Sequence, residues 1–254
     1  MIRGLYISSF GMKKGMQKVD VISNNIANID TRGFKKDKPV FSSFPEKELY
    51  RFESSKKDYT MPPSYIGTLP LGVSLIDIYL DPSRGMLEET KDPFNLSLVD
   101  EEQGFINFFT VNTPEGLRYT RNGTFTLNSE GYLVTTEGYN VIGENGPVRL
   151  DKGDFIVTEE GEIFQGGERK DALRVVSFRP EEVEKEGEGL YTSTSQSRPG
   201  NAKVLQGFIE KSNVNPVYEM VELISALRAY EASQRAVKAM DDTLGLAVNE
   251  IAKV

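Results

Sequence analysis

The chain opens with the stretch MIRGLYISSFGMKKGMQKVDVISNNIANI, residues 1–29, and closes with a stretch of similar character at residues 216–252. Apolar residues of the first stretch recur every seven positions, at Leu5, Met12, Val19 and Ile26. The second stretch carries the same repeat, at Leu223, Tyr230, Val237, Leu244 and Ile251. A seven-residue apolar repeat keeps one seam of a helix facing a partner helix, as in a coiled coil. The sequence therefore predicts two long terminal helices that pack with each other or with neighbouring chains.

The composition excludes most catalytic and metal-binding chemistry. The 254 residues include no Cys, no His and no Trp. Cys/His nucleophile pairs and Ser-His-Asp triads are therefore absent, and almost every kind of zinc site is excluded. Adjacent acidic pairs such as Glu101-Glu102 are expected in a chain with 38 acidic residues, and neighbours on a strand point to opposite faces. We therefore expect no enzyme activity, no cofactor and no bound metal.

The charge distribution argues against nucleic acid as a partner. Residues 1–36 carry a net charge of +5, but residues 81–200 carry −11 and the whole chain −8. A surface of that sign repels a polyanion. No apolar run approaches the length of about 18 residues that a spanning helix needs, so we expect no membrane insertion. Charged and small residues interrupt any hydrophobic core of a signal peptide near the N-terminus, so we expect no cleavable signal peptide.

Two different regions lie between the terminal helices. The first helix is expected to end near Asn28, and residues 37–80 contain five prolines and no helical period. We interpret residues 37–80 as an extended connector with one strand, from Val73 to Leu80. From about residue 81 to 205, glycines fall at regular intervals of seven to eight residues over much of the segment. The runs between them are rich in β-formers, which predicts an all-β hairpin domain.

This β region also contains an internal repeat with a shift of 30 residues. Gly123, Phe125, Leu127, Gly131 and Leu133 recur as Gly153, Phe155, Val157, Gly161 and Ile163. Two hairpins of like geometry need like residues, and we interpret the repeat in this way. The predicted fold class is α+β, with long N- and C-terminal coiled-coil helices flanking a mainly antiparallel all-β middle domain. The predicted regions are 1–36 for the N-terminal helix, 37–80 for the connector, 81–205 for the β domain and 206–254 for the C-terminal helix.

Three sets of motifs occur in order along the chain. The N-terminal set includes DVISNNIAN at residues 20–28 and TRGFKK at 31–36. The middle set is YTRNGTF at 119–125 and GYLVT at 131–135, and the C-terminal set includes SNVN at 212–215 and RAYE at 228–231. Together they resemble the axial proteins of the bacterial flagellum, the basal-body rod and hook family. GFINFF at residues 104–109 departs from the shorter Gly-Phe-Phe that relatives usually have, and residues 40–70 match less well.

The resemblance implies a structural subunit of the flagellar basal-body rod, which self-assembles into a hollow helical drive shaft for motility. It implies that both terminal helices lie in an inner coiled-coil layer, with the β domain outside. The implied partners are copies of the chain, other rod and hook proteins, and the type III export apparatus in transit. The implied location is the periplasmic rod of the basal body. Among family members, the length argues against the hook protein and leans towards the proximal rather than the distal rod type.

A subunit interface is the candidate site. The residues expected to carry it are Leu5, Met12, Val19, Asn24, Asn25, Ile26, Asn28, Leu223, Leu227, Tyr230, Val237 and Leu244. The three asparagines either fix the register of a helix seam or cap a helix end, and the two readings are compatible. Gly11 and Gly15 form a small-x-x-x-small pair that favours a close approach of helices. The alternative function is a β-domain binding or surface scaffold module that its helices merely oligomerise.

Overall fold

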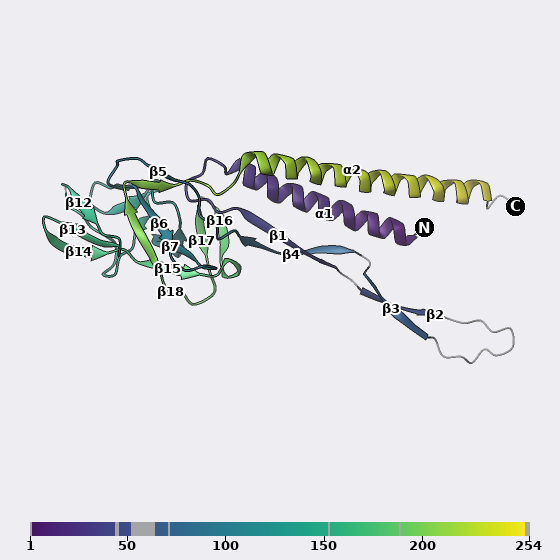
Figure 1. Cartoon of the computed structure of the whole chain (residues 1–254), viewed down its shortest axis with the longest axis horizontal. Helices are drawn as coiled ribbons and strands as arrows, with labels where there is room; N and C mark the ends of the chain where they lie inside the picture. The colour runs from purple at the N-terminus through teal and green to yellow at the C-terminus, as the bar shows by residue number, and fades with distance from the viewer. Residues whose placement is uncertain are drawn as a thin grey trace. The chain divides into compact units, whose positions relative to one another are not determined.

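The computed structural model describes residues 2–43, 46–51, 64–70, 72–151, 153–187 and 189–251. The chain divides into two compact units. One unit comprises residues 1–23, 39–78 and 217–254, and the other comprises residues 24–38 and 79–216. The first unit contains nearly all of both helices, and the second contains the β-rich middle of the chain (Figure 1).

Both predicted terminal helices are present. Helix α1 spans Ile2–Ala27, and helix α2 spans Pro216–Leu246 and continues as a π-helical segment, Ala247–Ile251. Pro216 begins α2 at the first helical position, where its missing N–H costs nothing. Helix α1 ends at the predicted place, since the backbone N–H of Asn28 bonds to the carbonyl groups of Asn24 and Asn25. The Ile251 of the predicted repeat lies at the end of the described residues, and its side chain lies outside them.

Residues 37–80 contain more strands than the sequence indicates. The predicted strand is present as β4, Val73–Leu80, and it pairs with β1, Asp37–Ser43. A second ribbon pairs β2, Glu46–Arg51, with β3, Ser64–Pro70, in antiparallel register. The rings of Tyr50 and Tyr65 meet edge to face across this ribbon at 5.7 Å. Prolines 45, 62 and 63 of the expected connector lie outside the described residues.

The middle of the chain is an assembly of antiparallel sheets. The largest has nine strands in the order β16-β17-β8-β7-β11-β10-β9, and β15 joins β7 to the edge strand β18. Smaller sheets pair β12-β13-β14, β6-β19 and β5-β20. The bounds are β5 Leu87–Glu89, β6 Leu96–Asp100, β7 Ile106–Thr113, β8 Gly116–Thr120, β9 Phe125–Leu127, β10 Leu133–Thr135, β11 Asn140–Val141, β12 Phe155–Val157, β13 Glu162–Gln165, β14 Glu168–Ala172, β15 Val175–Phe178, β16 Glu184–Gly187, β17 Leu190–Thr192, β18 Arg198–Pro199, β19 Ala202–Gln206 and β20 Phe208–Glu210, with a 3₁₀ turn at Pro180–Glu182. The α+β class, with two terminal helices and a mainly antiparallel middle, is confirmed.

The 30-residue repeat corresponds to two hairpins of the same geometry. In the β9–β10 hairpin Leu127 lies opposite Leu133, and in the β12–β13 hairpin Val157 lies opposite Ile163. Both turns contain a glycine at the same point, with φ of 85° at Gly131 and 84° at Gly161. Residues with a Cβ rarely adopt this left-handed conformation, which explains why the repeat keeps a glycine there.

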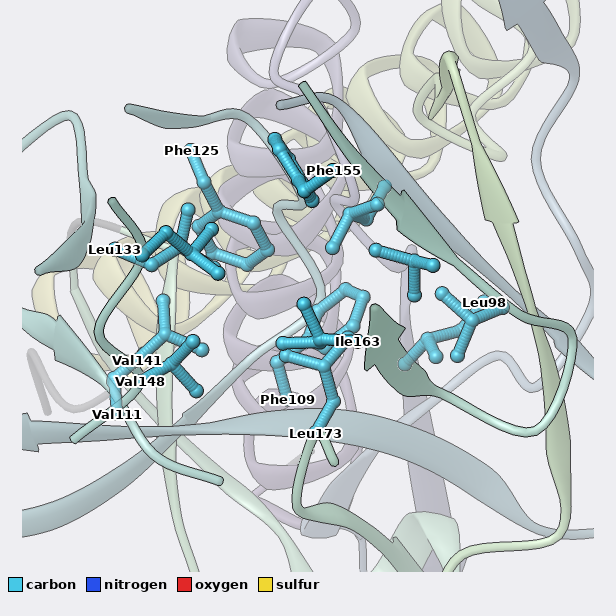
Figure 2. Packing of buried hydrophobic residues seen from close by; sticks show 14 residues of the cluster. Leu98, Phe109, Val111, Phe125, Leu133, Val141, Val148, Phe155, Ile163 and Leu173 are labelled. Carbon is cyan, nitrogen blue, oxygen red and sulfur yellow. The ribbon is translucent and has the colours of Figure 1, made fainter. Parts of the chain in front are cut away.

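The largest core of the middle unit includes residues of both hairpins and of β7 and β11 (Figure 2). Phe109 of β7 packs edge to face against Phe125 of β9, with ring centroids 5.2 Å apart. A second cluster lies around Phe108, the neighbour of Phe109 on β7, whose side chain points to the other face of the sheet. Strand β7 therefore contributes to two cores and is buried along nearly its whole length.

Strand β12 offers a matched test of this core. Phe155 and Val157 are buried, whereas Ile156 between them is 66 % exposed. We expect Phe155→Ala to lower the free energy of unfolding by about 3–5 kcal/mol, because it leaves a cavity against Phe94 and the neighbouring core. Ile156→Ala, the control on the same strand, should change it by less than about 0.5 kcal/mol. Urea denaturation followed by circular dichroism measures both, and equal losses would contradict the packing described here.

Candidate functional site

The terminal helices lie against each other in an antiparallel pair within their unit. Small residues of α1 provide the contact surface: a Cβ added at Gly4 would lie 2.7 Å from the side chain of Met240. One added at Gly11 would lie 2.9 Å from the Ser233 hydroxyl. Gly15 faces the backbone of Tyr230, whose Cα would lie 3.3 Å from an added Cβ. The predicted close approach at Gly11 and Gly15 is therefore present, and it includes Gly4 as well.

The predicted interface residues of the helices fall into two groups. Those in the seven-residue repeats are half-buried, on or beside the face where the two helices meet: Leu5, Met12, Val19, Ile26, Leu223, Tyr230, Val237 and Leu244. Leu227 is different, because it is 42 % exposed while its neighbour Ala226 is 3 % exposed. The seven-residue repeat alone does not tell that Ala226 is buried and Leu227 exposed.

Helix α2 has a second apolar face whose side chains are largely exposed. Its members recur every three or four positions, as expected for one side of a helix. They are Val217, Met220, Val221, Ile224 and Leu227, and their exposed fractions range from 42 % to 70 %. Contacts with α1 include those of Tyr230, Ser233 and Met240 with its glycines and the Lys18–Glu222 ion pair, all on the other side of α2. An apolar stripe on one helix with its opposite side already packed is a surface suited to a further partner helix.

The asparagines of the motif DVISNNIAN make local contacts. The side chain of Asn25 is buried, and its amide accepts from the N–H of Asp37 and donates to the carbonyl of Asp37. Asn28 donates to the carbonyl of Asn24 and accepts from the Thr31 hydroxyl. The bonds of Asn28 are those of a residue that caps the end of α1. The bonds of Asn25 hold Asp37, the first residue of β1. Asn24 is exposed.

A buried ionic cluster lies in the middle unit, and sequence analysis did not identify it. Glu210 of β20 accepts from two cations: Lys35 Nζ lies 2.8 Å from its Oε1, and Arg121 Nε lies 2.6 Å from its Oε2. Arg121 also forms a two-pronged contact with Asp100, at 2.7 and 2.9 Å. Backbone groups complete the cluster, since Lys35 donates to the carbonyl of Ser83 and Arg121 to the carbonyl groups of Leu98 and Asn107.

The electrostatics of the cluster follow from its burial and its balance of charge. Burial alone would raise the pKa of Glu210, but the positive charges of Arg121 and Lys35 outweigh it and hold that pKa below its usual value. Burial, together with the charge of Arg121, lowers the pKa of Lys35 against the opposing effect of Glu210. Two cations and two carboxylates are present, so the cluster has no net charge. Such a cluster is stable only when all its members are in place.

The same cluster joins the two ends of the middle unit. The N–H of Gly33 donates to the carbonyl of Glu210 at 2.8 Å, and the N–H of Lys36 donates to Asn213 Oδ1 at 2.7 Å. Gly33 has φ of 68°, and a Cβ there would lie 2.5 Å from the carbonyl carbon of Arg121. The segment that follows α1 is thereby fixed to the segment that precedes α2.

The described residues contain no group of three or more acidic residues arranged to hold a metal ion. No described helix combines the length and the hydropathy that crossing a membrane requires.

Comparison with known proteins finds three family profiles along the chain. The profile described as "Flagella basal body rod protein" matches residues 5–35. "Flagellar hook protein FlgE/F/G D1 domain" matches residues 106–167, and "Flagellar basal body rod FlgEFG protein C-terminal" matches residues 205–250. The flagellar basal-body rod protein FlgF of Caulobacter vibrioides is 31 % identical over the full length of both chains. The chain belongs to the flagellar basal-body rod protein family.

Other members of the rod family show similar likeness. The rod protein FlgG of Bacillus subtilis is 30 % identical over 98 % of this chain and 99 % of its own. FlgG of Buchnera aphidicola subsp. Schizaphis graminum is 33 % identical over 96 % of this chain and 98 % of its own. Each of the three matched segments contributes one residue to the buried cluster: Lys35, Arg121 and Glu210. The segments that define the rod family in this chain therefore meet at one set of charges.

The cluster can be tested by removing the shared carboxylate. Glu210→Ala leaves Lys35 and Arg121 buried without it, so we expect a loss of about 3–5 kcal/mol in the free energy of unfolding of the middle unit. Lys211→Ala is the control, because the Lys211–Glu88 pair is exposed on both sides and such pairs contribute about 0–1 kcal/mol. Urea denaturation measures both variants. A Glu210→Ala chain as stable as the Lys211→Ala chain would contradict a structural role for the cluster.

The pH dependence of the same site has a definite sign. A carboxylate with a lowered folded pKa stabilises the fold above the pKa of the unfolded chain, about 4.3 for Glu. That stability is lost as the pH falls through the lower folded pKa of Glu210. The stability difference between wild type and Glu210→Gln should therefore be constant from about pH 5 to 7 and shrink below about pH 4. Urea denaturation at stepped pH checks this, with Glu88→Gln as the exposed control. A difference that grows on acidification would contradict it.

Proposed function

We propose that this chain is a structural subunit of the flagellar basal-body rod, a hollow helical shaft built from many copies, and that it is not an enzyme. The observation that carries the proposal is the second apolar face of α2, Val217, Met220, Val221, Ile224 and Leu227. In a chain of the rod family, an exposed stripe of this kind serves assembly. One side of α2 packs on α1, and the exposed stripe on its other side packs on a helix of a neighbouring subunit.

The proposed assembly follows from repeated contacts between unlike surfaces. A head-to-tail contact between two different patches propagates into a helical array when its rotation does not close into a ring, and we propose that the rod contacts are of this open kind. In the proposed rod the terminal helices form an inner coiled-coil layer, and the middle domain, residues 81–205, lies outside it. The interface comprises the residues of both helices named in the sequence analysis, with Leu227 at its centre. Other rod and hook proteins are the expected neighbours at the two ends of the array.

The proposed location is the periplasmic part of the basal body. The chain reaches it through the type III export apparatus. A chain without Cys remains free of disulfide links during transit, which suits export in an unfolded state.

Leu227→Glu tests the proposal. Burying a leucine contributes about 1.5–3 kcal/mol, and an unpaired carboxylate in an apolar contact adds a desolvation cost of at least about 1–3 kcal/mol. Because every subunit carries the change, we expect cells that make and export the protein, do not swim, and lack complete rods in electron micrographs. Leu227 is 42 % exposed within one chain, so the purified variant should keep the melting transition of the middle domain.

Ser225→Glu is the matched control. Ser225 is exposed two residues away, on neither apolar face of α2, so cells carrying it should swim normally. Wild-type swimming of the Leu227→Glu strain would show that this face is not at a subunit contact. Two results together would favour a scaffold module in place of a rod subunit. The purified protein would form a finite soluble oligomer, and deletion of its gene would leave motility unchanged.

A further inference from the structure

The side chain of Phe105 lies between two arginines at an edge of the main sheet. The guanidinium carbon of Arg179 is 5.8 Å from the centre of the ring, and that of Arg198 is 5.1 Å from it. The strand register explains the grouping: Ile106 lies opposite Phe178, which places Phe105 beside Arg179, and Arg198 lies opposite Ser177 on the edge strand β18. The ring is half-buried and both arginines are exposed.

Neither guanidinium forms an ion pair with a described residue. Several other cations of the middle unit do pair with carboxylates, among them Arg118, Arg121, Arg169 and Lys185. Glu182 lies close in sequence, but its contact is with the backbone N–H of Arg179. Two like charges are thus held at one ring without a counter-charge.

We propose that Arg179, Phe105 and Arg198 form a docking site for carboxylate side chains on a second copy of this chain. A guanidinium that contacts a ring by its face keeps the N–H groups of its edge free, and these groups fit a carboxylate in a two-pronged geometry. Arginine and aromatic side chains are also the residues most enriched at the energetic centres of protein interfaces. The inference rests on the proposed function, since it names a second contact within the same assembly.

Charge complementarity identifies the occupant. Residues 81–200 carry a net charge of −11, so the middle domains of neighbouring copies repel one another unless a cationic spot meets an acidic one. The edge itself does not suit an added strand, because β18 has only two residues and one of them is Pro199. The edge therefore offers its side chains, and an acidic surface of a second copy is the partner that matches them.

Charge reversal tests the site. We expect Arg179→Glu/Arg198→Glu to reduce complete rods and swimming by about tenfold or more, because the loss of one hydrogen bond between a guanidinium and a carboxylate weakens a contact by about that factor. Arg149→Glu is the control for reversing an arginine charge elsewhere in the domain, because Arg149 is exposed and its guanidinium carbon lies 5.8 Å from the centre of the Tyr132 ring. The control should assemble normally, and purified variants should all keep the wild-type melting transition.

Selection of motile suppressors from the double variant identifies the occupant. A second copy predicts suppressors that replace an acidic residue of this same chain by Lys or Arg. Suppressors confined to another flagellar protein, or reversion only at positions 179 and 198, would overturn the assignment to a second copy. If the double-variant strain swims like wild type while the separate Leu227→Glu strain does not swim, the docking site alone is overturned. Swimming of both variants would instead remove the proposed rod function.

Discussion

The buried carboxylate of Glu210, which binds two cations at once, joins the segments of the middle unit. Glu210 accepts from Lys35 at one oxygen and from Arg121 at the other, and all three side chains are buried. These residues come from three distant parts of the sequence, so none of the three segments can take its place alone. A charge removed from water is costly unless its partners are present, so the cluster favours the complete arrangement over any partial one. The positions of the backbone around Gly33 and Asn213 follow from it.

Helix α2 has two apolar sides, one packed on α1 and one exposed. Its side towards α1 uses the half-buried residues of the seven-residue repeat against small residues of α1, which lets the two backbones come close. Its other side keeps Ile224 and Leu227 exposed. A helix that is apolar on two sides gains little from being alone in water, and its second side becomes stable only when a neighbour covers it. In the proposed rod, the stability of α2 therefore depends on assembly, whereas the stability of the β domain does not.

The sequence predicts elements well where the signal is local, and poorly where it depends on distant partners. The seven-residue repeats locate both helices to within a few residues, and the regular glycines locate β8 to β12 and β15. The apolar pattern does not tell which side of α2 is buried, because Leu223 and Leu227 are both apolar, yet Leu223 is half-buried and Leu227 is exposed. Strands β1 to β3 lack a clear alternation, and their pairing depends on residues outside each strand. The Lys35–Glu210 pair joins residues 175 positions apart, for which no periodicity exists. Its one sequence signal is the presence of Lys35 and Arg121 inside the motifs TRGFKK and YTRNGTF.

The hydrogen bonds of Gly33 with Glu210 and of Lys36 with Asn213 bring the entrance and the exit of the middle domain to one place. The middle domain is therefore inserted into the chain at a single place, like an exchangeable module. Loops such as those of the β12–β13 hairpin can lengthen, shorten or be exchanged without changing the span that the attachment points must bridge. Only the residues that hold the attachment, Asp100 and Arg121 among them, are bound by this constraint. Such a design lets evolution vary the middle domain of a rod-family chain while the terminal helices are kept.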